Sequence, residues 1–417
     1  MTYKLKPLNF EQISYYSLIV FALTLSLSRA SISFLVFWFL LLVILKRDYK
    51  SSFNIIKDNK IFLYIALFLG YIILSSLWSD YEEDTFSLLN KYFYWIIIPC
   101  IVILFKKEWL YKILNAFLFG MFISEIISYG IYFEILTGFN GGPLNPSPFM
   151  LTIHYSVFLA FTSLVLLYRF LFENESLKVK VILFSFFLMT TTNLMISTGR
   201  TGQLAFFVTL FIVFIIKYRV SLKSIILSVV FAVTISLVAY NSLDLFKKRV
   251  DAAISDVQNV VLEKDFESSW GIRAGFWIVT YDSLKESPIF GHGLGDYSKS
   301  AKQMIEKHEY LYFSKYVSEF ISDYHYHNQY LMLLVDSGVI GLFLFLLLCY
   351  KMYRLKIDDA EIKHISIIGI TVFLVSFIGE PLLLFKFPQM LFLFIISFSI
   401  VGANTKVNDS LKIIPKE

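Results

Sequence analysis

Long apolar runs alternate with short polar segments along most of this chain. A helix needs about 20 residues to cross the hydrocarbon core of a membrane, and each run comes close to that length. A helix is suited to this environment because it satisfies its own backbone hydrogen bonds. We therefore predict an all-α integral membrane protein with about twelve transmembrane helices, the first two short enough to form a hairpin instead. The predicted spans are residues 13–27, 32–45, 61–77, 92–105, 113–133, 151–170, 181–197, 203–216, 225–240, 328–349, 365–378 and 382–401.

The composition agrees with this pattern. Hydrophobic residues make up 57% of the chain, aromatic residues 18% and charged residues 17%, and the mean hydropathy is +0.67. These values exclude an ordinary water-soluble globular protein. Cys100 and Cys349 both lie in predicted spans, so neither a disulfide framework nor a cysteine metal site is indicated. The net charge of +5 is spread over short loops and does not indicate nucleic-acid binding.

The positions of Lys and Arg predict the orientation. Alternate short connections and the two termini carry 23 of the 37 basic residues, whereas the opposite short loops carry four. By the positive-inside rule both termini face the cytoplasm and the long polar segment faces outward. We accordingly divide the chain into residues 1–240 with helices 1–9, an outward-facing loop at 241–327 that carries several of the motifs discussed below, and residues 328–417 with helices 10–12 and a cytoplasmic tail.

The run His325-Tyr326-His327-Asn328 lies where the long loop meets the next apolar segment. An imidazole at this boundary is able to accept a proton from an incoming hydroxyl near neutral pH. The alternative is that both histidines are interfacial caps with apolar bodies and wet tips. Asp323, His325 and His327 alone form an incomplete metal-ligand set, so we expect no metal.

Two arginines are candidates for binding an anion. Arg200 lies in a tight outer turn and Arg273 in the long loop, where a planar guanidinium is suited to a lipid diphosphate. The alternatives are a snorkelling Arg200 and a solvated Arg273 on an amphipathic helix that buries Phe276 and Trp277.

The sequence leaves open the roles of four further ionisable residues and one loop. Glu125 and His154 fall within predicted spans, where they either pair with each other or backbone, or contact a donor lipid. Glu380 and Lys386 lie at the outer end of the last helical pair, where Lys386 either adds positive charge near phosphates or anchors the interface. Residues 137–148 are expected to form an ordered cap or a lid.

A glycine-rich turn, Gly291-His-Gly-Leu-Gly295, lacks the preceding strand of a nucleotide-binding loop. We expect it to let backbone segments pack closely beneath an active site.

From Ser197 onward, the order and spacing of four motifs resembles the O-antigen ligase and O-antigen polymerase family of bacterial surface-polysaccharide enzymes. The resemblance covers roughly the second half of the chain, while the first half is similar only in helix count and hydropathy. The motifs are Ser-Thr-Gly-Arg200, Gly-x-Arg273 with Trp277 four residues later, Ser287 to Gly295, and His327-Asn-Gln-Tyr-Leu331 followed by Asp336-Ser-Gly338.

This resemblance implies a metal-independent membrane glycosyltransferase of the GT-C type, without a cofactor, at the periplasmic face of a bacterial inner membrane. As an O-antigen ligase it would transfer a glycan from undecaprenyl diphosphate to a sugar hydroxyl of lipid A-core, with inversion; as a polymerase it would use another lipid-linked unit as acceptor. Carried over by position, His327 is the catalytic base and Arg200 and Arg273 bind the donor diphosphate. Accessory positions fall at His325, Asn328, Trp277 and Lys386.

A transporter of lipid-linked sugars and a membrane scaffold are the rival classes. A bundle of twelve helices suits a transporter equally well. The large outer loop, the clustering of His and Arg on one face and the lack of an internal repeat favour the enzyme.

Overall fold

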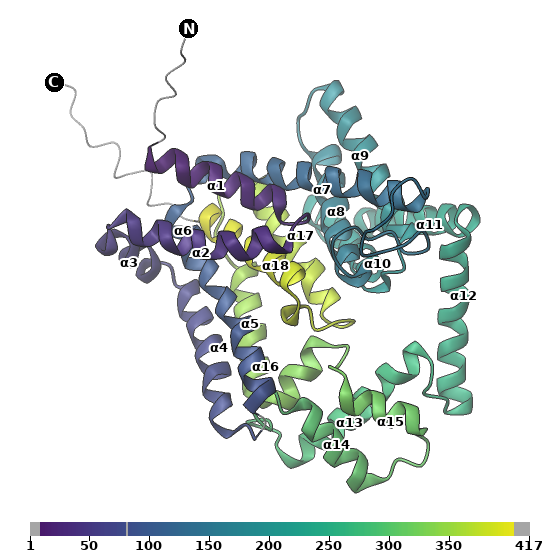
Figure 1. Cartoon of the computed structure of the whole chain (residues 1–417). Helices are drawn as coiled ribbons and strands as arrows, with labels where there is room; N and C mark the ends of the chain where they lie inside the picture. The colour runs from purple at the N-terminus through teal and green to yellow at the C-terminus, as the bar shows by residue number, and fades with distance from the viewer. Residues whose placement is uncertain (1–8, 81, 404–417) are drawn as a thin grey trace, which may run out of the picture.

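The structure is a computed structural model that describes residues 9–80 and 82–403, and this part of the chain forms helices joined by loops, without a strand (Figure 1). Ten of its helices are long and apolar enough to cross a membrane. The protein is therefore a multi-pass, all-α membrane protein, as predicted. The expected cytoplasmic tail at residues 404–417 lies outside the described residues.

All twelve predicted apolar runs fall on helices, and ten of the described helices have at least 18 residues and the hydropathy of a membrane span. The first run and the eleventh form shorter helices, of 15 and 17 residues. The helices before the long loop are α1 (Phe10–Thr24), α2 (Arg29–Lys46), α3 (Tyr49–Asp58), α4 (Ile61–Ser75), α5 (Glu82–Phe93), α6 (Ile97–Leu104), α7 (Leu110–Tyr132), α8 (Thr152–Phe172), α9 (Leu177–Ile196), α10 (Arg200–Tyr218) and α11 (Leu222–Ser242).

The centre of the bundle is formed by α8 and by α18 (Lys386–Ala403), which follows α17 (Ala360–Ser376). Within their spans, 78% of the residues of α8 and 89% of those of α18 are buried, against 17% in α11. Apolar residues therefore cover all sides of the two central helices, while α11 exposes most of its surface to the lipid.

The long loop folds into helices with a small core of its own. It contains α12 (Asp244–Gln258), α13 (Ser269–Glu286), α14 (Tyr297–His308) and α15 (Lys315–Asp323), and the chain then enters α16 (Gln329–Tyr353). Phe276, Val317 and Tyr326 are buried together with Val335 from the first turns of α16. This core joins the helices α13, α14 and α15 to the N-terminal end of α16, next to the candidate site.

A break in α16 receives the glycine-rich turn. Gly338 has φ 63° and ψ −167°, outside the helical region, and the N–H groups of His292 and Gly293 donate to the carbonyls of Val335 and Asp336 at 2.8 and 3.0 Å. A Cβ at Gly291 would lie 2.5 Å from the backbone nitrogen of Gly338. The glycines thus permit the close backbone packing that the sequence predicted.

Both ends of the described chain line one cavity of about 770 Å³, formed by Phe10 and Ala403 among others. Lys46, Lys60, Lys106 and Lys356 line the same cavity. The two ends therefore lie at a lysine-rich end of the bundle. The cytoplasmic position of this end stays a prediction of the positive-inside rule.

Candidate functional site

His325, His327 and Glu380 form one cluster at the junction of the long loop and the bundle. His327 Nδ1 lies 2.9 Å from Glu380 Oε2, and His325 Nε2 lies 3.2 Å from Glu380 Oε1. Glu380 is only 3% exposed, while the two imidazoles are 20% and 25% exposed. The carboxylate is thus buried behind two rings that remain accessible from outside.

Glu380 determines which nitrogen of His327 carries a proton. Burial would raise the pKa of the Glu380 carboxyl, but the hydrogen bonds from His325 and His327 outweigh it and lower this pKa to about 2. The ionised carboxylate is able only to accept hydrogen bonds, so Nδ1 of His327 must donate. In the neutral imidazole, Nε2 is then left unprotonated and free to accept a proton.

Aromatic rings hold the two imidazoles in place. The His327 ring stacks on Phe320 of α15 at 6.1 Å between centroids and meets Phe276 of α13 edge-on at 6.2 Å. The His325 ring contacts Phe385 at 5.3 Å. Asn328, the N-cap of α16, accepts hydrogen bonds from the backbone N–H groups of Tyr330 and Leu331 at 2.9 and 3.1 Å. The His-x-His-Asn motif is therefore anchored by the helix that it begins.

Arg273 shares the electrostatic environment of this cluster. Its guanidinium donates to the carbonyl and hydroxyl oxygens of Ser269, both at 2.7 Å. Burial lowers the pKa of Arg273; the negative charge of Glu380 opposes this effect and the positive charge of Arg200 adds to it. Arg273 lies three residues before Phe276 on α13, so the ring that touches His327 and the guanidinium come from one helical turn.

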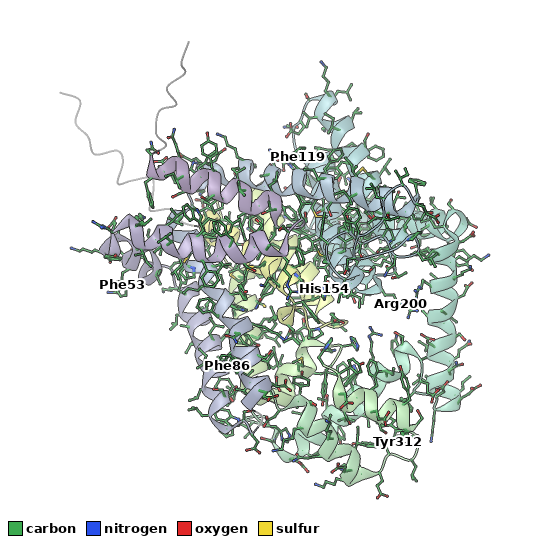
Figure 2. The ribbon with its side chains drawn as sticks, in the orientation of Figure 1. Phe53, Phe86, Phe119, His154, Arg200 and Tyr312 are labelled. Carbon is green, nitrogen blue, oxygen red and sulfur yellow. The ribbon has the colours of Figure 1, made fainter. Side chains whose placement is uncertain are left out.

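Arg200 is the first residue of α10 and points toward α12 and α13 (Figure 2). Its Nη1 lies 3.5 Å from Asp256 Oδ2 of α12, with the Arg200 side chain 32% exposed. The preceding turn is tied to residues 137–148 by a 2.6 Å hydrogen bond from Thr198 to Asn145. That segment thus supports the turn that carries Arg200, and its role as a cap or a lid stays a prediction.

An apolar groove of about 560 Å³ begins at Arg200 and runs between α10 and α12. Phe207, Phe246 and Ile254 are among its lining residues, and Arg200 and Arg249 contribute its positive charges. The site thus combines a proton acceptor, two guanidinium groups and an adjoining apolar surface.

Comparison with known proteins identifies a family for this part of the chain. Residues 184–346 match the family described as O-antigen ligase. The matched segment contains Arg200, Arg273 and His327, so the resemblance drawn from these motifs is confirmed. The match supports a membrane enzyme of the O-antigen ligase or polymerase type.

A second similarity is to an uncharacterized protein of Haemophilus influenzae. The two sequences are 27% identical over 237 residues, which is 54% of this chain. The chain spans 57% of the length of that relative.

Three residues considered in the sequence analysis lie outside the cluster of His325, His327 and Glu380. Trp277 is 55% exposed instead of buried with Phe276, because adjacent helix residues point about 100° apart. Lys386 donates to Ser33 at 2.8 Å and lies over the ring of Tyr94, so the structure favours an anchoring role. Asp323 is 60% exposed and pairs with Lys302, which separates it from the two histidines.

Glu125 and His154 do not pair with each other. Glu125 accepts a hydrogen bond from Thr190 at 2.9 Å, whereas the buried His154 ring lies 4.3 Å from that of Phe385. His154 therefore borders the cluster through Phe385, which also touches His325.

Glu380 and Asp256 are the two partners that sequence reasoning did not assign. Glu380 was recognised as an ionisable residue near the last pair of apolar helices. Its hydrogen bond to His327 joins residues 53 positions apart in the sequence, so no local sequence pattern predicts it. For Asp256, the sequence indicated only its position in the long loop and no partner.

Proposed function

We propose that this protein transfers a glycan from an undecaprenyl-diphosphate carrier to a sugar hydroxyl of lipid A-core, at the outer face of a bacterial inner membrane. The observation that carries the proposal is the hydrogen bond between His327 Nδ1 and the buried Glu380, which leaves His327 Nε2 as a proton acceptor. The match of residues 184–346 to the O-antigen ligase family supports this reaction class.

In the proposed reaction, His327 Nε2 takes the proton of the acceptor hydroxyl as its oxygen attacks the anomeric carbon of the donor glycan. The bond between that carbon and the diphosphate oxygen breaks, and its electron pair leaves with the diphosphate. In-line attack inverts the anomeric configuration. The donor arrives already activated, so the protein needs to orient the hydroxyl, remove its proton and neutralise the leaving group.

The two arginines bind the departing diphosphate. Arg273 retains further N–H donors beyond those held by Ser269, and the 3.5 Å contact between Arg200 and Asp256 is long enough to be exchanged for phosphate oxygens. The groove beside Arg200 provides an apolar surface for the prenyl chain of the same molecule.

The proposal is tested with purified protein, lipid-linked donor and acceptor in the presence of a chelator. His327→Ala should reduce transfer about a hundredfold to ten-thousandfold, the usual cost of losing a general base. His325→Ala should cost less, and His308→Ala, at an exposed site in α14, should behave as wild type. Normal turnover by His327→Ala would leave a transporter as the better description.

The acceptor is tested in cells with and without the gene. Loss of a ligase leaves polymerised glycan on its lipid carrier, so lipopolysaccharide should lack the long glycan while the carrier-linked polymer accumulates. Accumulation of single lipid-linked repeats would instead identify a polymerase.

A further inference from the structure

We infer that His325, His327 and Glu380 bind a zinc ion, and that zinc switches off the base at His327. One ligand atom from each of the three residues lies within 4.8 Å of the others, and no other group of this kind occurs in residues 9–80 and 82–403. Two imidazoles and one carboxylate are a ligand set that zinc commonly uses, with a fourth position open to water. The sequence places Asp323 beside the two histidines, an incomplete ligand set from which we expect no metal; the structure places Glu380 beside the histidines instead.

The existing distances are close to those of a metal site. Zinc bonds of about 2.0–2.2 Å in a tetrahedron hold neighbouring ligand atoms about 3.4 Å apart. His327 Nδ1 and His325 Nε2 already lie 2.9 and 3.2 Å from the two Glu380 oxygens. Small rotations of three side chains therefore bring these atoms around one ion, and the partial exposure of both imidazoles leaves a path from solvent.

Zinc at this position changes the tautomer of His327. Without metal, Nδ1 donates its proton to Glu380 and Nε2 is the acceptor. A zinc ion takes the lone pair of Nδ1, so the single proton of the neutral ring moves to Nε2 and no net proton is released. Nε2 then donates a hydrogen bond and is unable to accept a proton from a hydroxyl.

The same chemistry selects the kind of ion. Imidazole nitrogens suit zinc and other late first-row transition metals, whereas magnesium and calcium prefer sites built from oxygen ligands. We therefore expect zinc to bind even in the presence of a large excess of magnesium.

Zinc binding is measured directly on purified protein without a histidine affinity tag, by dialysis and elemental analysis. One zinc per chain is expected, and His325→Ala or Glu380→Gln should weaken binding by at least about tenfold, as loss of even an outer-shell partner does at metal sites. His308→Ala is the matched control and should retain full binding. Equal binding by wild type and both ligand variants would overturn the proposal.

Cobalt substitution tests the wild type alone, independently of how the variants fold. Cobalt(II) bound to nitrogen and oxygen ligands in a four- or five-coordinate site should give visible absorption bands that added zinc abolishes. The absence of these bands at stoichiometric cobalt would contradict the inference.

The inhibitory consequence rests on the proposed function, whereas the binding measurements do not. In the transfer assay, zinc should reduce turnover at least about tenfold at concentrations that fill the site, chelator should restore it, and magnesium should have no effect. Stoichiometric zinc binding with unchanged turnover would refute the switch at His327 and leave the binding site standing. An inactive protein that still binds zinc in this way would refute the proposed function alone.

Discussion

At the level of single residues, Arg200 and Arg273 are held in different ways. Arg273 is fixed by two short hydrogen bonds to Ser269 within its own helix. Arg200 has one long ion pair to Asp256, and both side chains are only partly buried; at 3.5 Å this pair holds Arg200 less firmly than the two 2.7 Å hydrogen bonds hold Arg273. Arg273 is thus already oriented, whereas Arg200 is free to reorient when a diphosphate replaces Asp256.

Replacing either arginine by lysine tests this role. Arg200→Lys and Arg273→Lys keep the charge but lose the planar fork. Each should reduce transfer about tenfold to a hundredfold, consistent with the loss of about 1.5–3 kcal/mol for a charge-assisted hydrogen bond. Arg354→Lys, at an exposed position after α16, is the control. Full activity in both site variants, measured at equal membrane insertion, would favour the snorkelling and solvated alternatives.

Glu380 is predicted to act through the tautomer of His327. Glu380→Gln removes the charged acceptor and leaves Nδ1 of His327 free to lose its proton. We expect kcat to fall about a hundredfold to ten-thousandfold with little change in KM, as when a carboxylate that orients a catalytic histidine is replaced by an amide. Glu380→Asp, which retains the charge, should recover part of kcat. A change confined to KM would instead assign Glu380 to substrate binding.

The sequence predicted individual chemical groups better than their partners. His327, Arg200 and Arg273 were recognisable because each has an uncommon side chain for its place near a membrane surface. The pairing of His327 with Glu380 and of Arg200 with Asp256 depends on how separate helices pack, which local spacing does not contain. The alternative in which Trp277 is buried beside Phe276 is excluded, because Phe276 takes the buried face of α13.

At the level of elements, the break in α16 is where the long loop docks onto the bundle. Gly338→Ala would place a Cβ on a residue with φ 63° and against the backbone of Ile289. The substitution should destabilise the protein by about 1–3 kcal/mol, measured by thermal unfolding in detergent. Gly70→Ala, in α4 with no atom within 4 Å of the new Cβ, should be neutral or slightly stabilising. Equal melting temperatures for the two variants would argue against a strained junction.

The groove between α10 and α12 is predicted to hold the prenyl chain of the donor. Ala253 lines this groove, so Ala253→Trp should fill it and raise KM for a long-chain donor about tenfold while sparing a short-chain analogue, since each buried CH₂ contributes about 0.8 kcal/mol. Ala252→Trp, on a different face of α12, is the control. An equal effect on both donors would show that the groove does not discriminate chain length.

Hydropathy predicted the positions of the helices because a chain in lipid has few other ways to satisfy its backbone. It did not predict their lengths or interruptions. The span expected at residues 92–105 begins instead at Glu83, through a polar first turn. The sequence predicted one continuous helix at residues 328–349. The break at Gly338 was not predicted, because it depends on the docking of the glycine-rich turn.

At the level of the whole molecule, the lysine-rich end predicts the orientation in the membrane. Single cysteines in a background without Cys100 and Cys349 test it: Leu311→Cys should react with an impermeant reagent from outside, and Val220→Cys only after the membrane is opened. These side chains are 97% and 81% exposed, so access through the protein does not limit the reaction. The reverse labelling pattern would show that the protein has the opposite orientation, and it would contradict the proposed reaction at the outer face of the membrane.

The contact between His327 and Glu380 also orders events during synthesis, because 53 residues separate its two ends. At translation rates of about 5–20 residues per second, the carboxylate is made about 3–10 s after the imidazole. In that interval the nascent chain already contains both arginines, while α18 has still to enter the centre of the bundle. Under the proposed mechanism, a ribosome-bound intermediate therefore has both arginines but lacks the carboxylate that orients His327. We expect glycan transfer to begin only after α17 and α18 have inserted.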